Sequence, residues 1–332
     1  MLAYIGRRLG FMLVLLVLLS VVSFILIQLP PGDYLTTLVA RRQLAGGEMT
    51  QAEKDALQQM YGLGLPLHRQ YLKWAGNLLR GDLGRSFQWN RPVSALVAER
   101  LPLTLVISAA ALLFTYLVAI PIGIYSATHQ YSFGDYTFTV VGFVGLAIPP
   151  FLLALILMFL FFKAFDMSTV GLFSPEYMDA PWSWAKLLDL LKHLPIPIVI
   201  NGVAGTAALI RVMRATLLDE LQKQYVITAR TKGLAERTVL FKYPVRMAIN
   251  PIVSTVGWLL PTIVSGETIT AIVLSLPTVG PLLYEALLWQ DMFLAGSLVM
   301  VLGMLVVIGT FLSDLLLVKV DPRIRYEQGY EQ

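Results

Sequence analysis

The sequence contains no cysteine, only three histidines and few charges. Without cysteine the chain can form neither a disulfide nor a thiolate metal site. His68, His129 and His193 are far apart in sequence, and we expect each to lie in a loop or an interface, with no metal bound. Only 14% of the residues are charged, against about 25% in typical soluble domains. This deficit, together with 57% hydrophobic residues, places the chain among membrane proteins.

Motifs for nucleotide binding and for proteolysis are also missing. The dipeptide GK does not occur, so the sequence has no phosphate loop and predicts no ATPase activity of its own. There is no HExxH motif and no Ser-His-Asp order that would suggest an intramembrane enzyme. The net charge of +4 is small and requires no nucleic-acid partner. We therefore predict that the chain is not an enzyme and binds no cofactor itself.

Long uncharged apolar runs recur along the chain. A transmembrane helix needs about 20 apolar residues. Six runs predict an all-α polytopic membrane protein with six transmembrane helices: Leu9–Pro31, Leu101–Thr128, Tyr136–Phe162, Pro195–Leu217, Met247–Ala271 and Met292–Val318. The first run follows Arg7 and Arg8, as a signal peptide would, but it is too long for one and precedes no small-residue cleavage site. We expect it to be a retained helix.

Six spans place both termini on the same side of the membrane. Arg7, Arg8, the basic stretch Tyr225–Pro244 and the tail KVDPRIRY then share that side, and the positive-inside rule makes it the cytoplasm. The expected divisions are an N-terminus with the first span (1–31), an external insertion (32–100), a five-helix core (101–320) with a cytoplasmic loop (217–247), and a cytoplasmic tail (321–332).

Proline and glycine interrupt two of the expected spans. Pro149 and Pro150 stand in the middle of the third run and should kink or break that helix. Gly257–Pro261 lies within the fifth run. Either place could flex during transport, and either could be a packing kink that neighbouring helices tolerate.

The stretch YVITARTKGLAERTVLFKYP (Tyr225–Pro244) is basic and favours helix within an otherwise apolar region. Apolar residues at Leu218, Leu221, Tyr225 and Ala229 recur at helical spacing and predict an amphipathic helix. Gly233 would end it, and a second short helix could begin near Ala235. Such a unit could contact a soluble partner, or it could lie on anionic lipid.

The same stretch, as QYVITARTKGLAERTVLFKY, resembles the cytoplasmic EAA loop of binding-protein-dependent ABC importer permeases, specifically the dipeptide/oligopeptide/nickel family. Three other stretches carry the resemblance in the right order: QYLKWAGNLLRGDLGRSF (Gln70–Phe87), RLPLTLVISAAALLFTYLVAIPIGIYSA (Arg100–Ala127) and DPRIRY (Asp321–Tyr326). Together they span nearly the whole chain.

This resemblance implies the fold of a type I ABC importer transmembrane domain in a bacterial or archaeal plasma (inner) membrane. Its partners would be a second homologous permease, two cytoplasmic ATPase subunits that bind ATP and Mg, an external solute-binding protein and membrane lipid. The EAA loop would be the coupling helix that contacts the ATPase. The implied coupling residues are Tyr225, Ala229, Arg230, Lys232, Gly233, Leu234 and Arg237. Ala229 would allow close packing and Gly233 the turn.

The sequence departs from the family pattern at two places. Ile227 stands where the loop motif has its leading Glu, as peptide-type permeases commonly show. Ala271 stands where an acid usually precedes the segment SLPTVG (Ser275–Gly280), and Glu267 lies one turn earlier. Glu267, Pro149 and Pro150 are candidate pathway residues, although Glu267 could equally reach water at the external interface.

The resemblance implies oligopeptides as the first substrate choice, because they are frequent substrates in the family. The altered segment GETITAIVLSLPTVG keeps oligosaccharides close behind. Nickel chelates come third, because the sequence has no cluster of histidines. An ion-coupled secondary transporter is a rival class, but it predicts several buried ionisable residues and often inverted repeats, and neither is visible. A membrane scaffold would explain the amphipathic loop but not the four family-like stretches.

Overall fold

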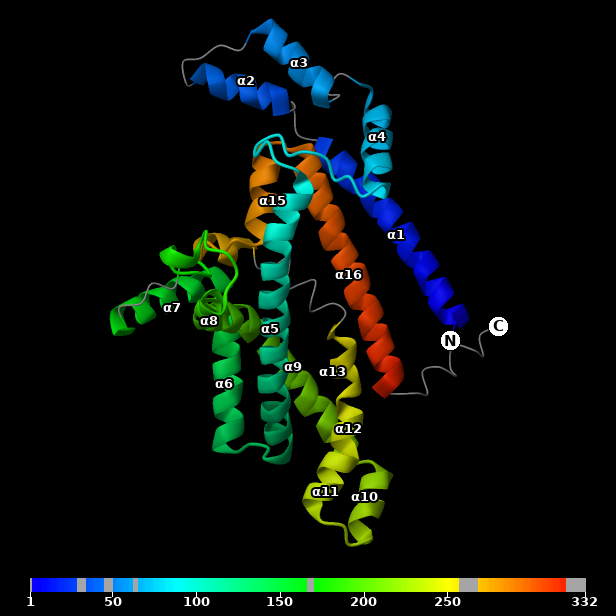
Figure 1. Ribbon diagram of the computed structural model, residues 1–332. Coiled ribbons are helices and arrows are strands. Elements are labelled where there is room, and N and C mark those ends of the chain that lie inside the picture. Colours follow the sequence, from blue (N-terminus) through cyan, green and yellow to red (C-terminus); the bar gives the residue numbers. More distant parts are fainter. Residues whose placement is uncertain are drawn as a thin grey trace. The chain divides into compact units, whose positions relative to one another are not determined.

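The computed structural model describes residues 2–28, 34–44, 50–61, 65–165, 170–256 and 268–320 (Figure 1). Within these ranges the chain is almost entirely helical, and extended pairing is limited to one isolated bridge between Arg85 and Pro92. The helices are α1 (Leu2–Gln28), α2 (Tyr34–Leu44), α3 (Gln51–Tyr61), α4 (Leu67–Leu79), α5 (Val93–Thr128), α6 (Phe133–Ala147), α7 (Pro150–Phe165), the 3₁₀ turn η1 (Pro175–Tyr177), α8 (Trp184–His193), α9 (Pro195–Leu221), α10 (Gln224–Thr231), α11 (Glu236–Lys242), α12 (Pro244–Ala248), α13 (Asn250–Ser254), α15 (Val279–Leu288) and α16 (Met292–Val320).

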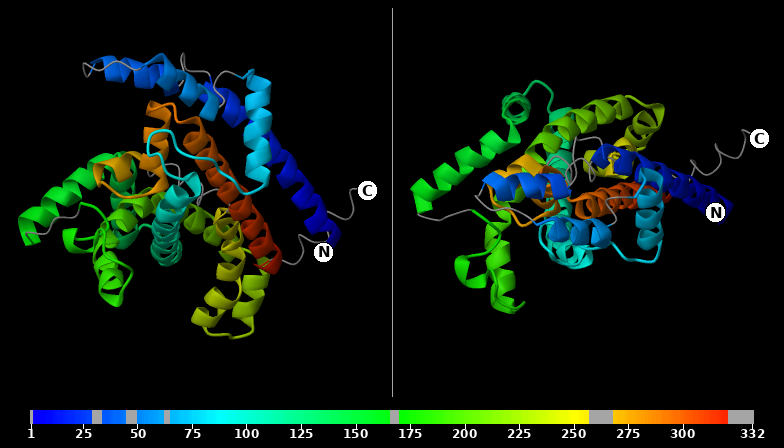
Figure 2. Two further views of the ribbon diagram at one scale, coloured as in Figure 1. Left: turned by 45° about the horizontal axis from the view of Figure 1, so that its top comes forward. Right: turned by 90° about the horizontal axis from the view of Figure 1, so that it is seen from above.

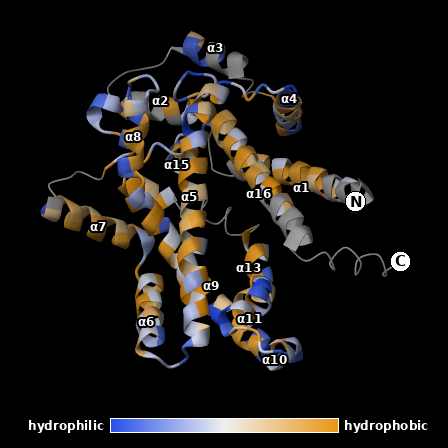
Figure 3. Cartoon of the chain, turned by 60° about the horizontal axis from the view of Figure 1, so that its bottom comes forward, coloured by the Kyte–Doolittle hydropathy of each residue, from blue (hydrophilic) through white to orange (hydrophobic). Residues whose placement is uncertain are grey.

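Among the described residues, three helices are long and apolar enough to cross a membrane, and α6 with α7 makes a fourth span if the bent pair is taken as one. The three are α5, α9 and the section Met292–Phe311 of α16, and they coincide with the second, fourth and sixth expected spans. The helix α1 contains a shorter apolar section, Gly10–Ile25. Figure 3 shows the hydrophobic colouring that runs along α5 and α7 and the mixed colouring of α10 and α11. These helices confirm a polytopic membrane protein without establishing six spans.

The expected third span is broken at its prolines. The helix α6 ends at Ala147, α7 begins at Pro150, and the two are bent by 105° relative to each other. Pro150 occupies the first position of α7, where its missing N–H leaves no hydrogen bond unmade. Ile148, directly before the two prolines, is extended, as residues before proline tend to be. The break expected at Pro149 and Pro150 within Tyr136–Phe162 is therefore present in the structure.

The expected fifth span lies partly outside the described residues. Its first part consists of the short helices α12 and α13, and residues 268–273 form a further helical stretch. Gly257–Pro261 and Glu267 fall outside the described ranges, as does the tail 321–332 with its DPRIRY sequence.

The chain divides into two compact units. Unit 1 comprises Met1–Thr104 and Pro277–Val307, and unit 2 comprises Leu105–Leu276 and Ile308–Gln332. In unit 1 a buried apolar cluster joins the start of α5 to α15 and α16 through residues such as Leu96, Leu282 and Leu298. A second cluster packs α4 against α1 and α16 around Trp74 and Phe24. The segment around α4 thus shares a core with α1 and α16 of its own unit.

Unit 2 is organised around α9, which packs against α5, α6, α7 and α12. Glycine permits the close approach of these helices. A Cβ atom added at Gly123 of α5 would lie 2.6 Å from the Cβ of Met213 on α9. A Cβ at Gly145 of α6 would lie 2.5 Å from a methyl group of Val203 on α9. An ion pair between Arg214 Nη2 of α9 and Asp135 Oδ2 of α6, 3.1 Å long, adds a polar contact near one end of the pair.

Candidate coupling loop and external anchor

The loop 217–247 forms a helix–turn–helix at the carboxyl end of α9 (Figure 1). The helix predicted to run through Leu218, Leu221, Tyr225 and Ala229 is interrupted, because α9 ends at Leu221 and α10 begins at Gln224. Lys223 is extended, with φ −72° and ψ 147°, and the N–H groups of Val226 and Ile227 donate to its carbonyl oxygen. The chain therefore changes direction at Lys223, about two helical turns before Arg230.

Gly233 forms the turn between α10 and α11. Its φ is +73°, a left-handed conformation that glycine adopts without the steric cost of a Cβ. Its N–H donates to the carbonyl oxygen of Arg230 at 2.9 Å. The helix α11 then begins at Glu236, after Ala235. The predicted order of helix, glycine turn and second helix is thus present in the structure.

The two short helices pack on each other through a small apolar interior. Val226 and Ala229 of α10 are buried against Val239 of α11, and Tyr243 covers them. Ala229 is only 5% exposed, so its small side chain lets α10 and α11 approach each other and does not present a surface to a partner. This interior makes the loop a folded unit, which a purely lipid-bound amphipathic helix would not require.

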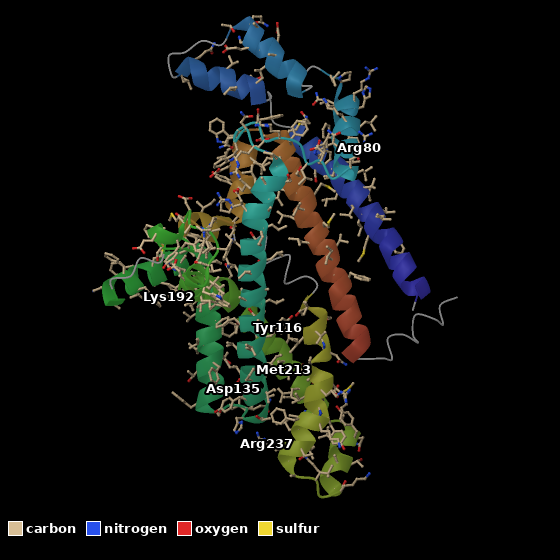
Figure 4. All side chains as sticks on the ribbon, in the orientation of Figure 1. Arg80, Tyr116, Asp135, Lys192, Met213 and Arg237 are labelled. Atoms are coloured by element: carbon tan, nitrogen blue, oxygen red, sulfur yellow. The ribbon has the colours of Figure 1, made fainter. Side chains whose placement is uncertain are left out.

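The loop is fixed to the membrane helices by α12 and α13. Val245 and Ala248 of α12 belong to the same buried cluster as Met213 and Leu217 of α9. The hydroxyl of Thr216 on α9 donates to the carbonyl oxygen of Ala248 at 3.2 Å. Figure 4 labels Met213 and Tyr116, and the Tyr116 hydroxyl donates to the carbonyl oxygen of Ile252 at 3.2 Å. A displacement of the loop would therefore be transmitted to α5 and α9.

The outer surface of the loop combines apolar and basic side chains. Exposed apolar groups are Tyr225, Ile227, Leu234 and Phe241, and exposed cations include Lys232 and Arg237. Figure 4 shows Arg237 on the outer side of α11. Of the predicted coupling residues, six lie on this surface or in its turn, and Ala229 alone lies inside. Sequence analysis missed Ile227 and Phe241 as surface groups, although both are apolar residues on otherwise polar helix faces.

Electrostatic contacts within the loop hold its shape. Arg230 Nη2 lies 2.6 Å from Glu236 Oε1. This hydrogen bond and the opposite charge raise the pKa of Arg230 and lower the pKa of Glu236. The hydroxyl of Tyr225 donates to the carboxylate of Glu220, and partial burial together with that carboxylate raises the pKa of Tyr225. The exposed cations of Lys232 and Arg237 face outward and can meet an anionic surface.

Two of the three candidate pathway residues lie within the described ranges. Pro149 and Pro150 are exposed at the break between α6 and α7, and Glu267 is outside the described residues. Within the described ranges, no group of three or more His, Asp and Glu side chains is placed to hold a metal ion.

The segment between α4 and α5 is held at the start of α16 by a buried carboxylate that the sequence did not indicate. Asp291 is fully buried, and its Oδ2 accepts hydrogen bonds from the Ser86 hydroxyl at 2.5 Å and from the Gln88 N–H at 3.1 Å. Its Oδ1 accepts from the Leu294 N–H at 3.2 Å. Burial raises the pKa of Asp291, and these hydrogen bonds oppose that rise. Ser86 is 205 positions away in sequence, so no local pattern indicates the pair.

Comparison with known proteins covers almost the entire chain. Residues 119–326 match the family described as "Binding-protein-dependent transport system inner membrane component", and residues 1–108 match its N-terminal family. The oligopeptide transport system permease protein AppB of Bacillus subtilis is 32% identical over 327 residues, covering 98% of this chain and 100% of AppB. A putative peptide permease protein of Brucella ovis is 36% identical, covering 98% and 99% of the two chains.

A third relative is the di/tripeptide transport system permease protein DppB of Pseudomonas aeruginosa, 30% identical over 99% of this chain and 100% of DppB. Among solved structures, a chain of the inward-facing MetNI methionine ABC transporter matches with a TM-score of 0.54 and 14% identity. The match covers 69% of this chain and 97% of that one. At this identity the likeness concerns the fold alone, which is that of a type I ABC importer transmembrane domain.

Proposed function

Since the chain belongs to the family of inner membrane components of binding-protein-dependent transport systems, we propose that it forms half of the passage of an ATP-driven peptide importer. It is a permease subunit, and ATP hydrolysis takes place on two partner subunits. A second, homologous permease completes the passage. Both termini and the loop 217–247 lie in the cytoplasm, in a bacterial or archaeal inner membrane.

One observation carries this proposal beyond family membership: the loop 217–247 is a folded helix–turn–helix with its own buried interior. A lipid-bound helix needs only an apolar face towards the acyl chains. Here Val226, Ala229 and Val239 are buried inside the unit and cannot contact lipid, while cations and other apolar groups are exposed on its surface. That arrangement suits a protein groove which recognises shape as well as charge.

The connection of the loop to the core supplies a mechanism for coupling. ATP binding and hydrolysis move the ATPase subunits, and the loop follows them as a rigid unit. The hydrogen bond from Thr216 to Ala248 and the shared apolar cluster around Met213 pass the displacement to α9 and α5. The helices then open or close the passage. No chemistry occurs on this chain, whose residues only bind, move and shape the route.

The proposed substrate is an oligopeptide delivered by an external binding protein. Its support is the agreement among relatives that cover nearly the full chain and are themselves described as oligopeptide, di/tripeptide or peptide permeases. We assign contact with the binding protein to the external insertion 32–100, which Asp291 attaches to α16. Glu267, Pro149 and Pro150 remain candidate elements of the passage.

The test is reconstitution of the complete transporter in proteoliposomes, with this chain, its partner permease, the ATPase subunits and the binding protein. We expect ATP-dependent uptake of labelled oligopeptides that requires the binding protein. Parallel assays use oligosaccharides and a nickel chelate, the two alternative substrates. Uptake of either in place of peptide would overturn the substrate assignment. Uptake driven by an ion gradient without ATP would overturn the importer mechanism.

A pair of variants separates the coupling loop from general damage. Replacing Ala229 by Leu forces a larger group between α10 and α11 and should cost about 1–3 kcal/mol of local stability. Replacing the adjacent, exposed Thr228 by Leu places the same side chain on the surface instead. We expect Ala229→Leu to lose ATP-driven uptake while the chain stays in the membrane, and Thr228→Leu to retain most of it. Equal activity of the two would argue against the loop as the coupling element.

A further inference from the structure

The helix α8, between α7 and α9, buries two charged side chains beside Leu190 and exposes three large apolar ones. Lys186 and Asp189 are each only 7% exposed. Trp184, Leu188 and Leu191 are 82%, 58% and 53% exposed. The three apolar residues are spaced i, i+4 and i+7, which places them on one face of the helix. This polarity is the reverse of that expected for a helix covering a soluble subdomain.

The loop that precedes α8 supplies hydrogen-bond partners to both buried charged side chains. Lys186 Nζ donates to the carbonyl oxygens of Ala180 at 2.6 Å and Met178 at 3.3 Å, and it lies 4.8 Å from the centre of the Phe173 ring. Asp189 accepts from both the N–H and the hydroxyl of Ser174, each at 2.7 Å. The inward orientation of the polar face is therefore fixed by several specific contacts, and α8 cannot turn its apolar face inward without breaking them.

The helix lies at the end of a membrane-spanning helix. Leu194 both ends α8 and precedes α9, so no loop separates the two. The 27 residues of α9 extend over about 40 Å, compared with a hydrocarbon core of about 30 Å. Since the coupling loop follows the carboxyl end of α9, α8 lies at the opposite membrane surface. Its apolar face is thus at the depth where headgroups meet acyl chains.

The direction and flanks of α8 fit that depth. In Figure 1 α8 is seen nearly along its axis, whereas the view from above in Figure 2 shows it lengthwise, so it lies across the direction of α6. A helix across the spans can lie in the plane of the membrane surface. Trp182 and Trp184 are suited to this interface, where tryptophan is enriched. Lys192, labelled in Figure 4, is exposed next to the apolar face and can reach lipid phosphates.

We infer that α8 is an interfacial membrane anchor, whose Trp184–Leu188–Leu191 face is buried in lipid at the membrane surface opposite the coupling loop. Three large apolar side chains exposed side by side are unfavourable in water, and immersion in lipid removes that cost. The anchor holds the amino end of α9 at a fixed depth. When the coupling loop moves the carboxyl end of α9, the helix then tilts about its amino end. It does not shift along the membrane normal.

The absence of cysteine from the chain makes a direct test available. Single spin labels are attached at Leu188→Cys and Leu191→Cys, with Glu176→Cys as the matched control on an exposed, charged position of the preceding loop. The complete transporter, with partner subunits free of reactive cysteine, is placed in phospholipid nanodiscs. Electron paramagnetic resonance then measures the accessibility of each label to oxygen, which enters lipid, and to a water-soluble nickel chelate.

We expect the labels at positions 188 and 191 to be more accessible to oxygen than to nickel, and the label at 176 to show the reverse. Low accessibility to both reagents at 188 and 191 would mean that a protein subunit covers the face, and high accessibility to nickel would mean that water does. Either result overturns the inference, as does an oxygen preference at 176. The measurement does not depend on the transported substrate, so failure of peptide uptake would leave it unaffected.

Discussion

Arg230 and Glu236 bracket the Gly233 turn, with Arg230 Nη2 2.6 Å from Glu236 Oε1. The ion pair joins α10 to α11 on the exposed side, and the buried side chains of Val226, Ala229 and Val239 join them on the inner side. Both charged side chains are largely exposed, so we expect a contribution of about 0.2–1 kcal/mol, reduced further by salt. The pair therefore sets the shape of the loop more than the stability of the chain.

The first prediction concerns the pH dependence of this pair. The hydrogen bond from Arg230 lowers the pKa of Glu236 from 4.5, so the stabilisation is present above that ordinary value and is lost as the pH falls through the lowered one. Hydrogen-exchange mass spectrometry of the segment 224–242 should show faster exchange in Arg230→Gln than in the unchanged chain at pH 7. After correction for intrinsic exchange rates, this difference should disappear in strong acid. A difference that is constant with pH would rule out the ion pair as its cause.

The second prediction concerns Gly233 and tests whether its backbone conformation, rather than lack of room for a side chain, requires glycine. A Cβ atom there would meet nothing within 4 Å, so only its φ of +73° opposes substitution. A β-branched residue in this conformation is strongly disfavoured, whereas Asn tolerates it. We expect Gly233→Val to lose ATP-driven uptake and Gly233→Asn to retain most of it, with both variants inserted in the membrane.

Activity of both Gly233 variants would show that the turn is not needed for coupling. Loss of activity in Gly233→Asn, with the assembled complex intact, would point instead to close approach of a partner at this position. Uptake assays with the four-component transporter, together with co-purification of the ATPase subunits, distinguish these results.

Local features of the sequence were sufficient to predict several elements. The turn at Gly233 and the break at Pro149 and Pro150 follow from backbone properties of single residues. The spans α5 and α9 follow from long apolar runs. The interruption at Gln222 and Lys223 could not be predicted in this way, because neither residue breaks a helix. The position of α10 depends on packing Val226 and Ala229 against Val239, which lies on another helix.

Two other features depend on contacts between distant residues or on environment. The sequence around Asp291 is that of an ordinary helix start, and its partner Ser86 is 205 positions away, so only the folded chain shows the pair. The sequence of α8 shows apolar residues at helical spacing, but this pattern does not tell which face of the helix is buried. The contacts of Asp189 with Ser174 decide that, and they invert the orientation expected in water.

The third prediction tests the hydrogen bonds by which Asp291 holds Ser86 and Gln88 at the start of α16. Asp291 receives donors on both carboxylate oxygens, so an Asn side chain must place its NH₂ group against at least one of them. We expect Asp291→Asn to destabilise unit 1 by about 1–3 kcal/mol, measured as a lower temperature of thermal unfolding in detergent. Asp82→Asn is the control, because Asp82 is exposed and accepts one bond through Oδ1, which an Asn oxygen can replace.

A change at Asp291 that matched the Asp82 control would show that the buried hydrogen bonds are not what attaches the insertion to α16. A selective loss of binding-protein-dependent uptake in Asp291→Asn, with unchanged unfolding temperature, would instead assign Asp291 a part in docking.

The fourth prediction addresses the contact between α5 and α9, through which the proposed loop movement would reach α5. The Cβ of an alanine at position 123 would lie 2.6 Å from Met213 Cβ and 2.7 Å from its Cγ, far inside normal contact distance. We expect Gly123→Ala to push the two helices apart, at a cost of about 1–3 kcal/mol. Gly76→Ala is the control, because a Cβ at Gly76 meets nothing within 4 Å.

The identity of the clashing atoms allows a stricter test of the same contact. Met213→Ala keeps the Cβ and therefore should not rescue Gly123→Ala, whereas Met213→Gly removes both clashing atoms and should rescue it in part. Thermal unfolding of the two double variants and of all single variants gives the coupling free energy between the positions. If the Ala and Gly replacements at position 213 rescued equally, the close approach of the α5 and α9 backbones would not be the source of the effect. A fixed separation of these helices would then no longer be required for transmission from the loop.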